Sequence, residues 1–346
     1  METLWFCLIA LMLTVYVILD GFDLGAGIVH FCVARDDAER RRVLASIGPV
    51  WDGNEVWLLA AGGTLYFAFP LLYASGFSGL YLPLMIVLWL LILRGAAIEF
   101  RSHIAGPLWR PFWDFVFTAA SALLAVFFGA ALGNVVRGAP LEADGQFFLP
   151  LWTDFRPGPQ PGILDWYTIL VGLMAFLALA QHGALWVALK NEDPIRGRAR
   201  RVAWLAWHGV AGMTLIVTGA TFRVQPHVPE RLSQQPWGLI FPALALAGLL
   251  WGMLLQRAGR DALAFLASCL YLAGMLASAA FGLYPYVLPS AGERQFGLTV
   301  YNTAAGPYGM RVALYWWIPG MLLVALYTWF VYRRFAGKVR LEEEGY

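Results

Sequence analysis

The sequence has few charges: only 13% of its 346 residues are Asp, Glu, Lys or Arg, and 60% are hydrophobic. Soluble proteins contain about 25% charged and about 45–50% apolar residues. The composition therefore excludes disordered, collagen-like and coiled-coil chains and indicates a multi-pass membrane protein. The net charge of +2 does not favour a nucleic-acid partner.

Several other signals are missing. Cys7, Cys32 and Cys269 lie in or beside apolar segments without CxxC spacing, so the sequence indicates neither a disulfide framework nor a structural zinc site. No nucleophile motif of a soluble enzyme, Rossmann fingerprint or P-loop is found. The chain starts without the basic region of a secretory signal, and its first apolar run continues past residue 30, so we expect this run to stay as a helix.

The apolar runs predict an all-α membrane protein with nine transmembrane helices. A membrane-spanning helix needs roughly 20 apolar residues to cross about 30 Å of hydrocarbon. Nine helices leave room only for loops, so residues 1–346 are expected to form a single integral membrane domain. The main alternative is eight helices, because the second run is the least hydrophobic. The nine helices are expected at about 4–33, 45–69, 78–100, 112–136, 163–189, 202–223, 237–256, 262–286 and 312–332.

The distribution of basic residues predicts the orientation. Of the 24 Lys and Arg residues, 17 fall after the first, third, fifth, seventh and ninth helices, six fall on the other side, and Arg94 lies inside the third. Basic loops stay in the cytoplasm, so we expect the N-terminus outside and the C-terminus inside. Arg clusters at 40–42 and 198–201 fit two four-helix units plus a ninth helix, although any cytoplasmic loop collects Arg equally well.

Buried charges are the candidate functional residues. A charge at bilayer depth costs roughly 2.5–3.5 kcal/mol on insertion scales, so each one needs a reason. The acids come in pairs three residues apart, which places each pair on one helix face. The candidates are Asp20 and Asp23 in the first helix, Asp52 and Glu55 in the second, and Arg94 and Glu99 in the third.

At about 1.5 Å of rise per residue, four of these carboxylates and Arg94 reach a common level in the inner half of the membrane. Such a cluster can hold water and conduct protons. The alternative is an ion-paired network that only fixes helix packing. For Asp52 and Glu55 a functional role is favoured, because one Arg cannot neutralise four carboxylates in hydrocarbon.

Two histidines give a rival interpretation. His182 and His208 lie in the inner third of adjacent predicted helices, where they would hold a haem between them. A pair of hydrogen-bonded membrane histidines explains them as well. A third class, a secondary transporter, would also carry buried acids, but it would be expected to have discontinuous helices near the midplane.

The segments that carry the acids resemble subunit II of the cytochrome bd-type ubiquinol oxidases, a family that includes the cyanide-insensitive oxidases. The similarity runs from the first predicted helix to the ninth. Its motifs are LDGFDLGAG at 19–27, IGPVWDGNEVWL at 47–58, FSGLYLP at 77–83, the Arg94 to Ser102 segment, and YPYVLPS at 284–290.

The resemblance implies an electrogenic, non-pumping oxidase of a bacterial cytoplasmic membrane that oxidises quinol and reduces oxygen to water. Subunit I holds two haems b and one haem d, and subunit II has none, so this chain is not catalytic alone and the haem role of His182 and His208 is disfavoured. The implied architecture is two four-helix bundles plus one peripheral helix. Subunit II would stabilise subunit I and supply part of a cytoplasmic proton route.

The resemblance also implies residue roles and partners. Asp23 and Asp52 match family positions that are linked to the proton route, whereas Glu55, Asp20, Arg94 and Glu99 are added from their depth. Some members have Gln at the position of Glu55. The family further implies membrane lipids, a small single-helix accessory subunit in some complexes, and a bound structural quinone for which no residue here identifies a site.

Overall fold

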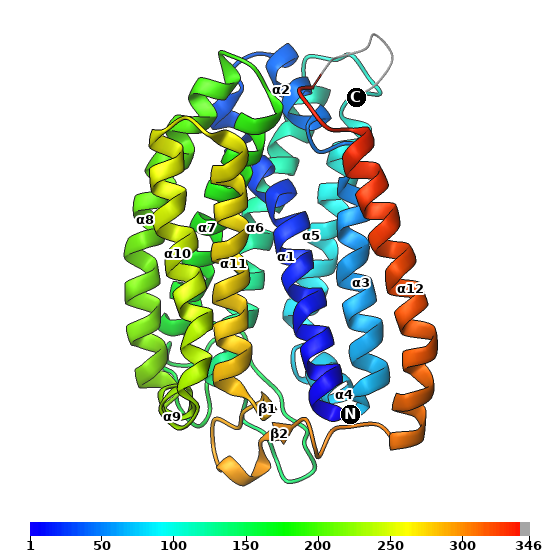
Figure 1. Cartoon of the computed structure of the whole chain (residues 1–346), viewed down its shortest axis with the longest axis vertical. Helices are drawn as coiled ribbons and strands as arrows, with labels where there is room; N and C mark the ends of the chain where they lie inside the picture. The colour runs from blue at the N-terminus through cyan, green and yellow to red at the C-terminus, as the bar shows by residue number, and fades with distance from the viewer. Residues whose placement is uncertain (340–346) are drawn as a thin grey trace.

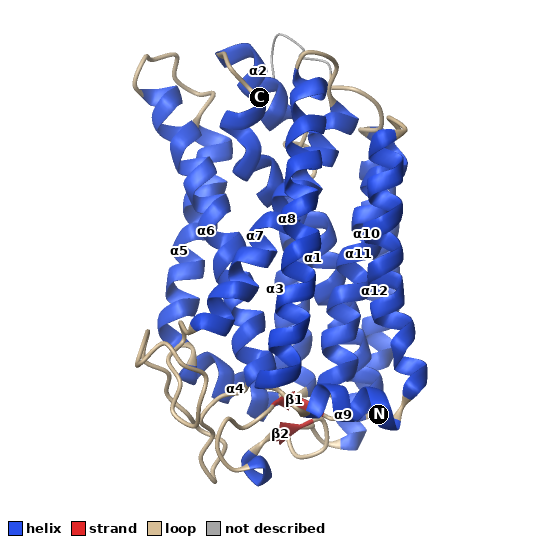
Figure 2. Ribbon diagram, turned by 90° about the vertical axis from the view of Figure 1, so that its left-hand side faces the viewer, coloured by secondary structure: helices blue, strands red, loops and turns tan. Residues whose placement is uncertain are grey.

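The computed structural model describes residues 1–339. Most of its helices run along one axis (Figures 1 and 2). Two short strands, β1 (Tyr286–Leu288) and β2 (Leu298–Thr299), pair antiparallel at the end that carries the N-terminus. The long helices are α1 (Glu2–Val33), α5 (Tyr81–Phe100), α6 (Trp109–Arg137), α7 (Trp166–Lys190), α8 (Ile195–Val224), α10 (Ile240–Arg257), α11 (Asp261–Leu283) and α12 (Pro307–Arg334).

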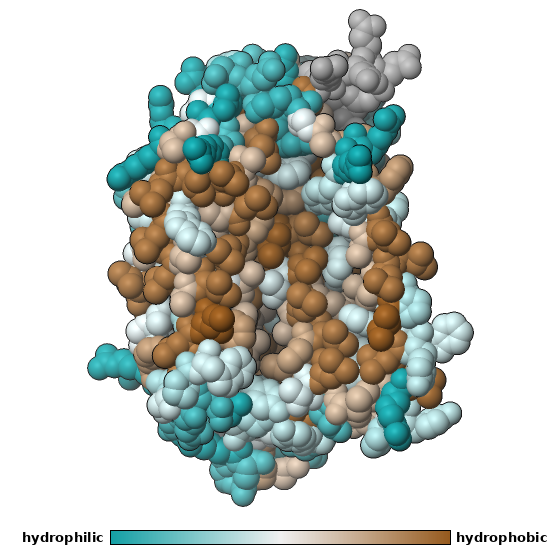
Figure 3. All heavy atoms as spheres, in the orientation of Figure 1, coloured by the Kyte–Doolittle hydropathy of each residue, from teal (hydrophilic) through white to brown (hydrophobic). Residues whose placement is uncertain are grey.

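Exposed hydrophobic side chains on the long helices form an apolar belt. In Figure 3 hydrophobic side chains cover the middle of the visible face, and hydrophilic side chains cover both ends. Leu59, Leu215 and Leu323 are each about 70% exposed within this belt (72, 73 and 68%). A soluble monomer rarely exposes contiguous apolar surface of this extent, so the belt faces lipid or other membrane subunits.

Within residues 1–339, eight helices are long and apolar enough to span a membrane, and nine when α3 (Trp51–Ala68) and α4 (Pro70–Gly79) count as one broken span. The break at Phe69 bends the chain by 119°, and Pro70 begins α4 because its missing N–H is tolerated there. The α3 helix alone measures about 27 Å and runs beside α1 (Figure 1). The predicted all-helical, multi-pass fold is confirmed.

Short helices occupy the segments that were expected to be loops. The predicted second helix, 45–69, is preceded by the polar helix α2 (Asp37–Ala45), whose N-cap residue Asp36 accepts a hydrogen bond from the backbone N–H of Glu39 at 2.9 Å. This cap satisfies an otherwise unpaired backbone group. The remaining short helices are α9 (His227–Gln234), η1 (Pro236–Leu239) and η2 (Arg294–Phe296).

Helix ends differ from the expected ones where polar residues extend a helix or proline stops it. The α8 helix begins at Ile195 rather than near 202, because its first turns are held outside the apolar belt by ion pairs. The α11 helix ends at Leu283 rather than at 286, because Pro285 disfavours helical backbone at Tyr284. Hydrophobicity alone detects neither effect.

Helix α1 lies at the centre of the bundle and packs against α3, α6 and α7. A Cβ placed on Gly25 would lie 2.0 Å from the carbonyl oxygen of Leu179, and one on Gly183 would lie 2.1 Å from the carbonyl carbon of Gly25. Glycine at both positions therefore permits the backbones of α1 and α7 to touch, as small residues do between membrane helices.

Helix α12 lies at the edge of the bundle beside α3 (Figure 1). Its long side chains, including Tyr315, Trp316 and Leu323, are largely exposed. The grouping into two four-helix bundles plus a peripheral helix stays a prediction. The C-terminal segment, with Arg340 that the orientation argument counted, lies outside the described residues.

Candidate functional site

The centre of the site is a buried ion triad between α1, α3 and α5. The Arg94 guanidinium donates to Asp20 through Nη1 at 2.6 Å and to Glu55 through Nη2 at 3.1 Å. The side chains of Asp20 and Arg94 are fully buried, whereas that of Glu55 is 22% exposed. The ion triad thus joins three helices and compensates the cost of burying the Arg94 charge in hydrocarbon.

Asp23 lies one turn from Asp20 but has no cationic partner. Its Oδ2 accepts a hydrogen bond from the Asn54 amide at 2.7 Å, and the Asn54 carbonyl oxygen accepts one from the Tyr332 hydroxyl at 2.8 Å. Asp23 is fully buried, and its Oδ1 has no protein partner. The Oδ2 of Asp20 and the hydroxyl of Tyr16 are also buried without a protein partner.

Asp52 and Glu99 lie outside this group. Helix α3 begins at Trp51, so Asp52 is in its first turn, where its side chain is exposed and makes no polar contact with the described residues. Glu99 is half-buried near the end of α5, and its side chain likewise has no polar partner among residues 1–339. The structure therefore brings together Asp20, Asp23, Glu55 and Arg94.

The depth expected for Asp52 and Glu55 requires a second helix that starts near residue 45. Residues 46–50 instead form a buried turn, in which Ser46 and Ile47 are 2% and 0% exposed. This turn is as hydrophobic as a membrane helix, so the hydrophobic pattern does not show where the turn ends and α3 begins.

The two histidines do not form a ligand pair. His182 uses both ring nitrogens: Nε2 donates to the Ile18 carbonyl at 2.9 Å, and Nδ1 lies 2.7 Å from the Ser268 hydroxyl. His208 is exposed, and its Nδ1 donates to the Trp204 carbonyl at 2.8 Å. Neither nitrogen of His182 is free for iron, so this chain's residues do not fit a haem held by both histidines. Residues 1–339 also contain no cluster of three metal-binding side chains.

The helix break does not match that of a secondary transporter. Transporter helices are interrupted near the midplane, where they bind substrate. The break at Phe69 comes only after α3 has covered about 27 Å, close to the full hydrocarbon thickness.

A second buried cluster, which the sequence analysis missed, lies at the C-terminal end of α1, beyond Asp20 and Asp23. Arg101 donates to Asp114 at 2.6 Å and to Asp37 at 2.8 Å, and the imidazole of His30 lies 2.8 Å from Asp114. Arg40 adds a contact to Asp114 at 3.3 Å. Burial opposes the charge of Arg101, but its hydrogen bonds to Asp114 and Asp37 outweigh burial and raise the pKa of Arg101.

One signal pointed to this cluster: Asp114 is an acid at the start of an otherwise apolar helix. Its partners come from three other segments, α1, α2 and the end of α5. Such long-range contacts leave no spacing pattern in the sequence. The cluster locks these elements together and leaves no carboxylate oxygen of Asp114 unpaired.

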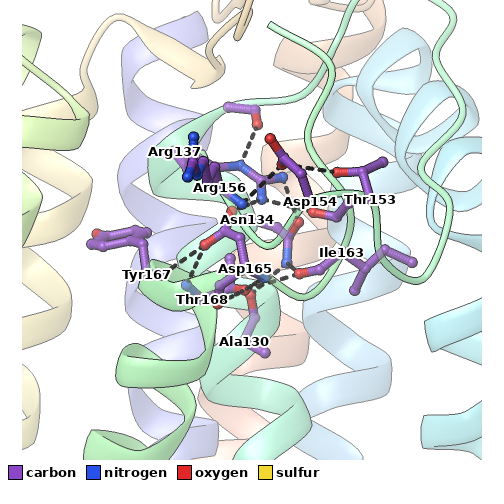
Figure 4. Close-up of polar contacts among 12 residues, drawn as sticks. Ala130, Asn134, Arg137, Thr153, Asp154, Arg156, Ile163, Asp165, Tyr167 and Thr168 are labelled. Atoms are coloured by element: carbon purple, nitrogen blue, oxygen red, sulfur yellow. Dashed lines mark hydrogen bonds and ion pairs between the residues drawn. The ribbon is translucent and has the colours of Figure 1, made fainter. Parts of the chain in front are cut away.

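The opposite end of the bundle has its own buried ion pair. Asp165 caps α7 by accepting the backbone N–H groups of Tyr167 and Thr168, and its other oxygen pairs with Arg137 at the end of α6. The Asn134 side-chain oxygen accepts a further hydrogen bond from Arg137 at 2.7 Å. Figure 4 shows these contacts, which join α6 to α7 across the connecting loop.

Comparisons with known proteins match nearly the whole chain. The sequence profile of the cytochrome bd terminal oxidase subunit II family matches residues 1–335. A probable cytochrome oxidase subunit 2 of Haemophilus influenzae is 30% identical over 97% of this chain and 94% of its own length. The cytochrome bd-I ubiquinol oxidase subunit 2 of Escherichia coli is 27% identical over 98% and 95%.

A solved structure shows the same fold. A chain of the bd oxidase from Geobacillus thermodenitrificans superposes with a TM-score of 0.75, at 20% identity, over 97% of this chain and 98% of that one. The family match and the near-complete coverage of the relatives agree with each other. The chain belongs to the cytochrome bd terminal oxidase subunit II family.

Proposed function

We propose that this chain is the non-haem subunit II of a bd-type terminal quinol oxidase that couples quinol oxidation to the reduction of oxygen to water. The observation that carries the proposal is the family match over residues 1–335. Relatives named as cytochrome bd ubiquinol oxidase subunits align over 96–98% of the chain, including the helices that hold the buried acids. The enzyme is an electrogenic oxidoreductase without proton pumping, and this chain is one part of it.

The haems of the complex, two b and one d, belong to the partner subunit I. The engagement of both His182 nitrogens supports this assignment, because iron would have to displace the Ile18 carbonyl or the Ser268 hydroxyl. When bound there, the haems supply the electron transfer and the oxygen chemistry. The chain described here would stabilise subunit I within a multi-subunit complex, together with lipids, a single-helix accessory subunit and a structural quinone.

The second part of the proposal is a share in proton uptake. Arg94 contacts both Asp20 and Glu55, so these two acids share one cation in an ion triad. Asp23 has only the neutral Asn54 amide beside it and therefore can gain and release a proton without breaking an ion pair. Asp52, exposed one turn before Glu55, is the acid that takes the proton from the cytoplasm.

The orientation that this route needs is N-terminus outside and C-terminus in the cytoplasm. The polar helix α2 and the end of α12 lie at one end of the molecule, and the N-terminus lies at the other (Figure 1). The Arg-rich start of α8 lies beside α2, because Arg198 pairs with Glu39. These two basic segments thus lie at one end of the single membrane domain, which supports a cytoplasmic face there.

Affinity purification of this chain from native membranes tests the oxidase assignment. We expect a haem-rich partner to co-purify, and we expect the complex to consume oxygen when quinol is supplied. Purification with a partner that lacks haem, or a complex without quinol-driven oxygen uptake, would contradict the assignment. The acid route is tested separately by the variants in the Discussion.

A further inference from the structure

A cavity of about 290 Å³ lies at the N-terminal end of the bundle, where α6 ends, α7 begins and α8 ends. Its lining includes Arg137, Trp166, Arg223 and the Pro157–Pro159 loop. Two guanidinium groups thus border the cavity, and none of its lining residues carries a carboxylate. A cavity with this lining favours an anion.

Arg137 is the buried wall of the cavity. It is 4% exposed and makes four hydrogen bonds: Nε to the Gly138 carbonyl, Nη1 to the Gly162 carbonyl and to Asp165, and Nη2 to Asn134. A guanidinium has five N–H groups, so one N–H on Nη2 has no protein partner. The contacts in Figure 4 fix the guanidinium plane, so this donor is held in place.

Arg223 supplies the uncompensated charge. It lies in the last turn of α8, where the helix dipole favours a cation. Its side chain is exposed and has no polar partner among the described residues. Asp165 already neutralises Arg137, so the cavity carries about one net positive charge, from Arg223.

Trp166 indicates the level of the cavity in the membrane. It is the first residue of α7 and is 40% exposed. Tryptophan concentrates at the boundary between hydrocarbon and headgroups. The cavity therefore opens where the phosphates of a lipid leaflet lie.

We infer that this cavity binds a phosphate group, with the free N–H of Arg137 and the guanidinium of Arg223 donating to its oxygens. The single negative charge of a phosphodiester matches the charge of Arg223. The cavity has no carboxylate to receive an ammonium group, so phosphatidylglycerol is preferred to phosphatidylethanolamine. A phospholipid headgroup and free inorganic phosphate share this chemistry.

The first experiment measures lipid binding by native mass spectrometry of the purified oxidase complex. Phosphatidylglycerol is titrated into the wild-type complex, the Arg223→Gln variant, and the Arg294→Gln variant as a control. Arg294 is also exposed and without a polar side-chain partner at this end, but it does not line the cavity. Charge-assisted hydrogen bonds are the strong ones, and we expect Arg223→Gln to weaken binding about tenfold, which corresponds to about 1.4 kcal/mol, while Arg294→Gln leaves it unchanged.

Inorganic phosphate is the second probe, with thermal unfolding of the same three complexes as the readout. Stabilisation by phosphatidylglycerol but not by millimolar phosphate, lost only in Arg223→Gln, assigns the site to a lipid headgroup. Stabilisation by phosphate alone, lost only in Arg223→Gln, assigns it to the free ion. Equal responses of the three complexes to both probes overturn the inference. None of these readouts uses oxidase turnover, so their failure is distinct from failure of the proposed function.

Discussion

Two substitutions on one face of α1 separate packing from proton transfer. Asp20→Asn removes the negative charge that Arg94 contacts at 2.6 Å and leaves Glu55, at 3.1 Å, as the anionic partner of the buried guanidinium. Breaking a buried ion pair by removing one partner costs about 3–5 kcal/mol, and the remaining contact to Glu55 places this case at the lower end. We expect Asp20→Asn to reduce the yield of assembled, haem-containing complex.

Asp23→Asn should behave differently. The new amide oxygen still accepts from Asn54, and no cation loses its partner, so the cost is at most that of a typical hydrogen bond, about 0.5–1.5 kcal/mol. The amide cannot exchange a proton at this position. We expect normal haem content and a fall in quinol-driven oxygen consumption of about tenfold or more, where tenfold corresponds to about 1.4 kcal/mol on the barrier.

Haem content is read from the reduced-minus-oxidised spectrum, and turnover from an oxygen electrode. Asp144→Asn, in an exposed loop at the other end of the molecule, is the matched control. Full turnover of Asp23→Asn across the pH range would refute the proton role of Asp23. Normal assembly of Asp20→Asn would refute the energetic argument for the triad.

Three further predictions test packing, a surface ion pair and topology. Gly25→Ala should prevent assembly, because its Cβ would lie 2.0 Å from the Leu179 carbonyl oxygen. Gly62→Ala is the control, since its Cβ would have nothing within 4 Å, and this variant should unfold at the wild-type temperature in a thermal-unfolding assay of the complex. Burial opposes the charge of Glu39, but its ion pair with Arg198 and its hydrogen bond from the Arg35 backbone N–H together outweigh burial and lower the pKa of Glu39. The stabilisation from this ion pair is therefore present above the usual Glu value of about 4.3 and is lost as the pH falls through the lowered value. Glu39→Gln should therefore unfold at a lower temperature than the wild type at pH 7, with the gap closing in acid; a gap that widens in acid would contradict this sign. A phosphatase fused to the C-terminus should be inactive and a fluorescent protein should be bright, and the reverse pair of results would contradict the orientation.

The sequence predicts the helices well, because each crossing requires a long apolar run. It also predicts a structural or functional role for the charged residues in α1, α3 and α5, because a charge such as Asp20 or Arg94 is costly in hydrocarbon. Their pairing at 2.6 Å agrees with the common depth expected for them. The start of α3 is missed because the buried turn at 46–50 has the hydrophobicity of a helix.

The contacts that join distant segments are beyond the sequence. Asp114 is tied to His30 and Arg101 from two other helical segments, and Arg137 meets Asp165 across a loop of more than two dozen residues. Neither pairing follows a helical or strand period, so local patterns cannot indicate it. Local patterns can also suggest a contact that does not exist. His182 and His208 have similar expected depths on neighbouring helices, but His208 is exposed.

We propose that this chain carries no haem of its own and works beside a haem-bearing partner. The most direct test is the haem-to-chain ratio of the chain expressed alone, compared with the complex purified from native membranes. We expect no haem absorption from the chain alone and a haem-rich spectrum from the complex. One haem per chain in the isolated protein would contradict this proposal and would require His182 to give up its contacts with Ile18 and Ser268.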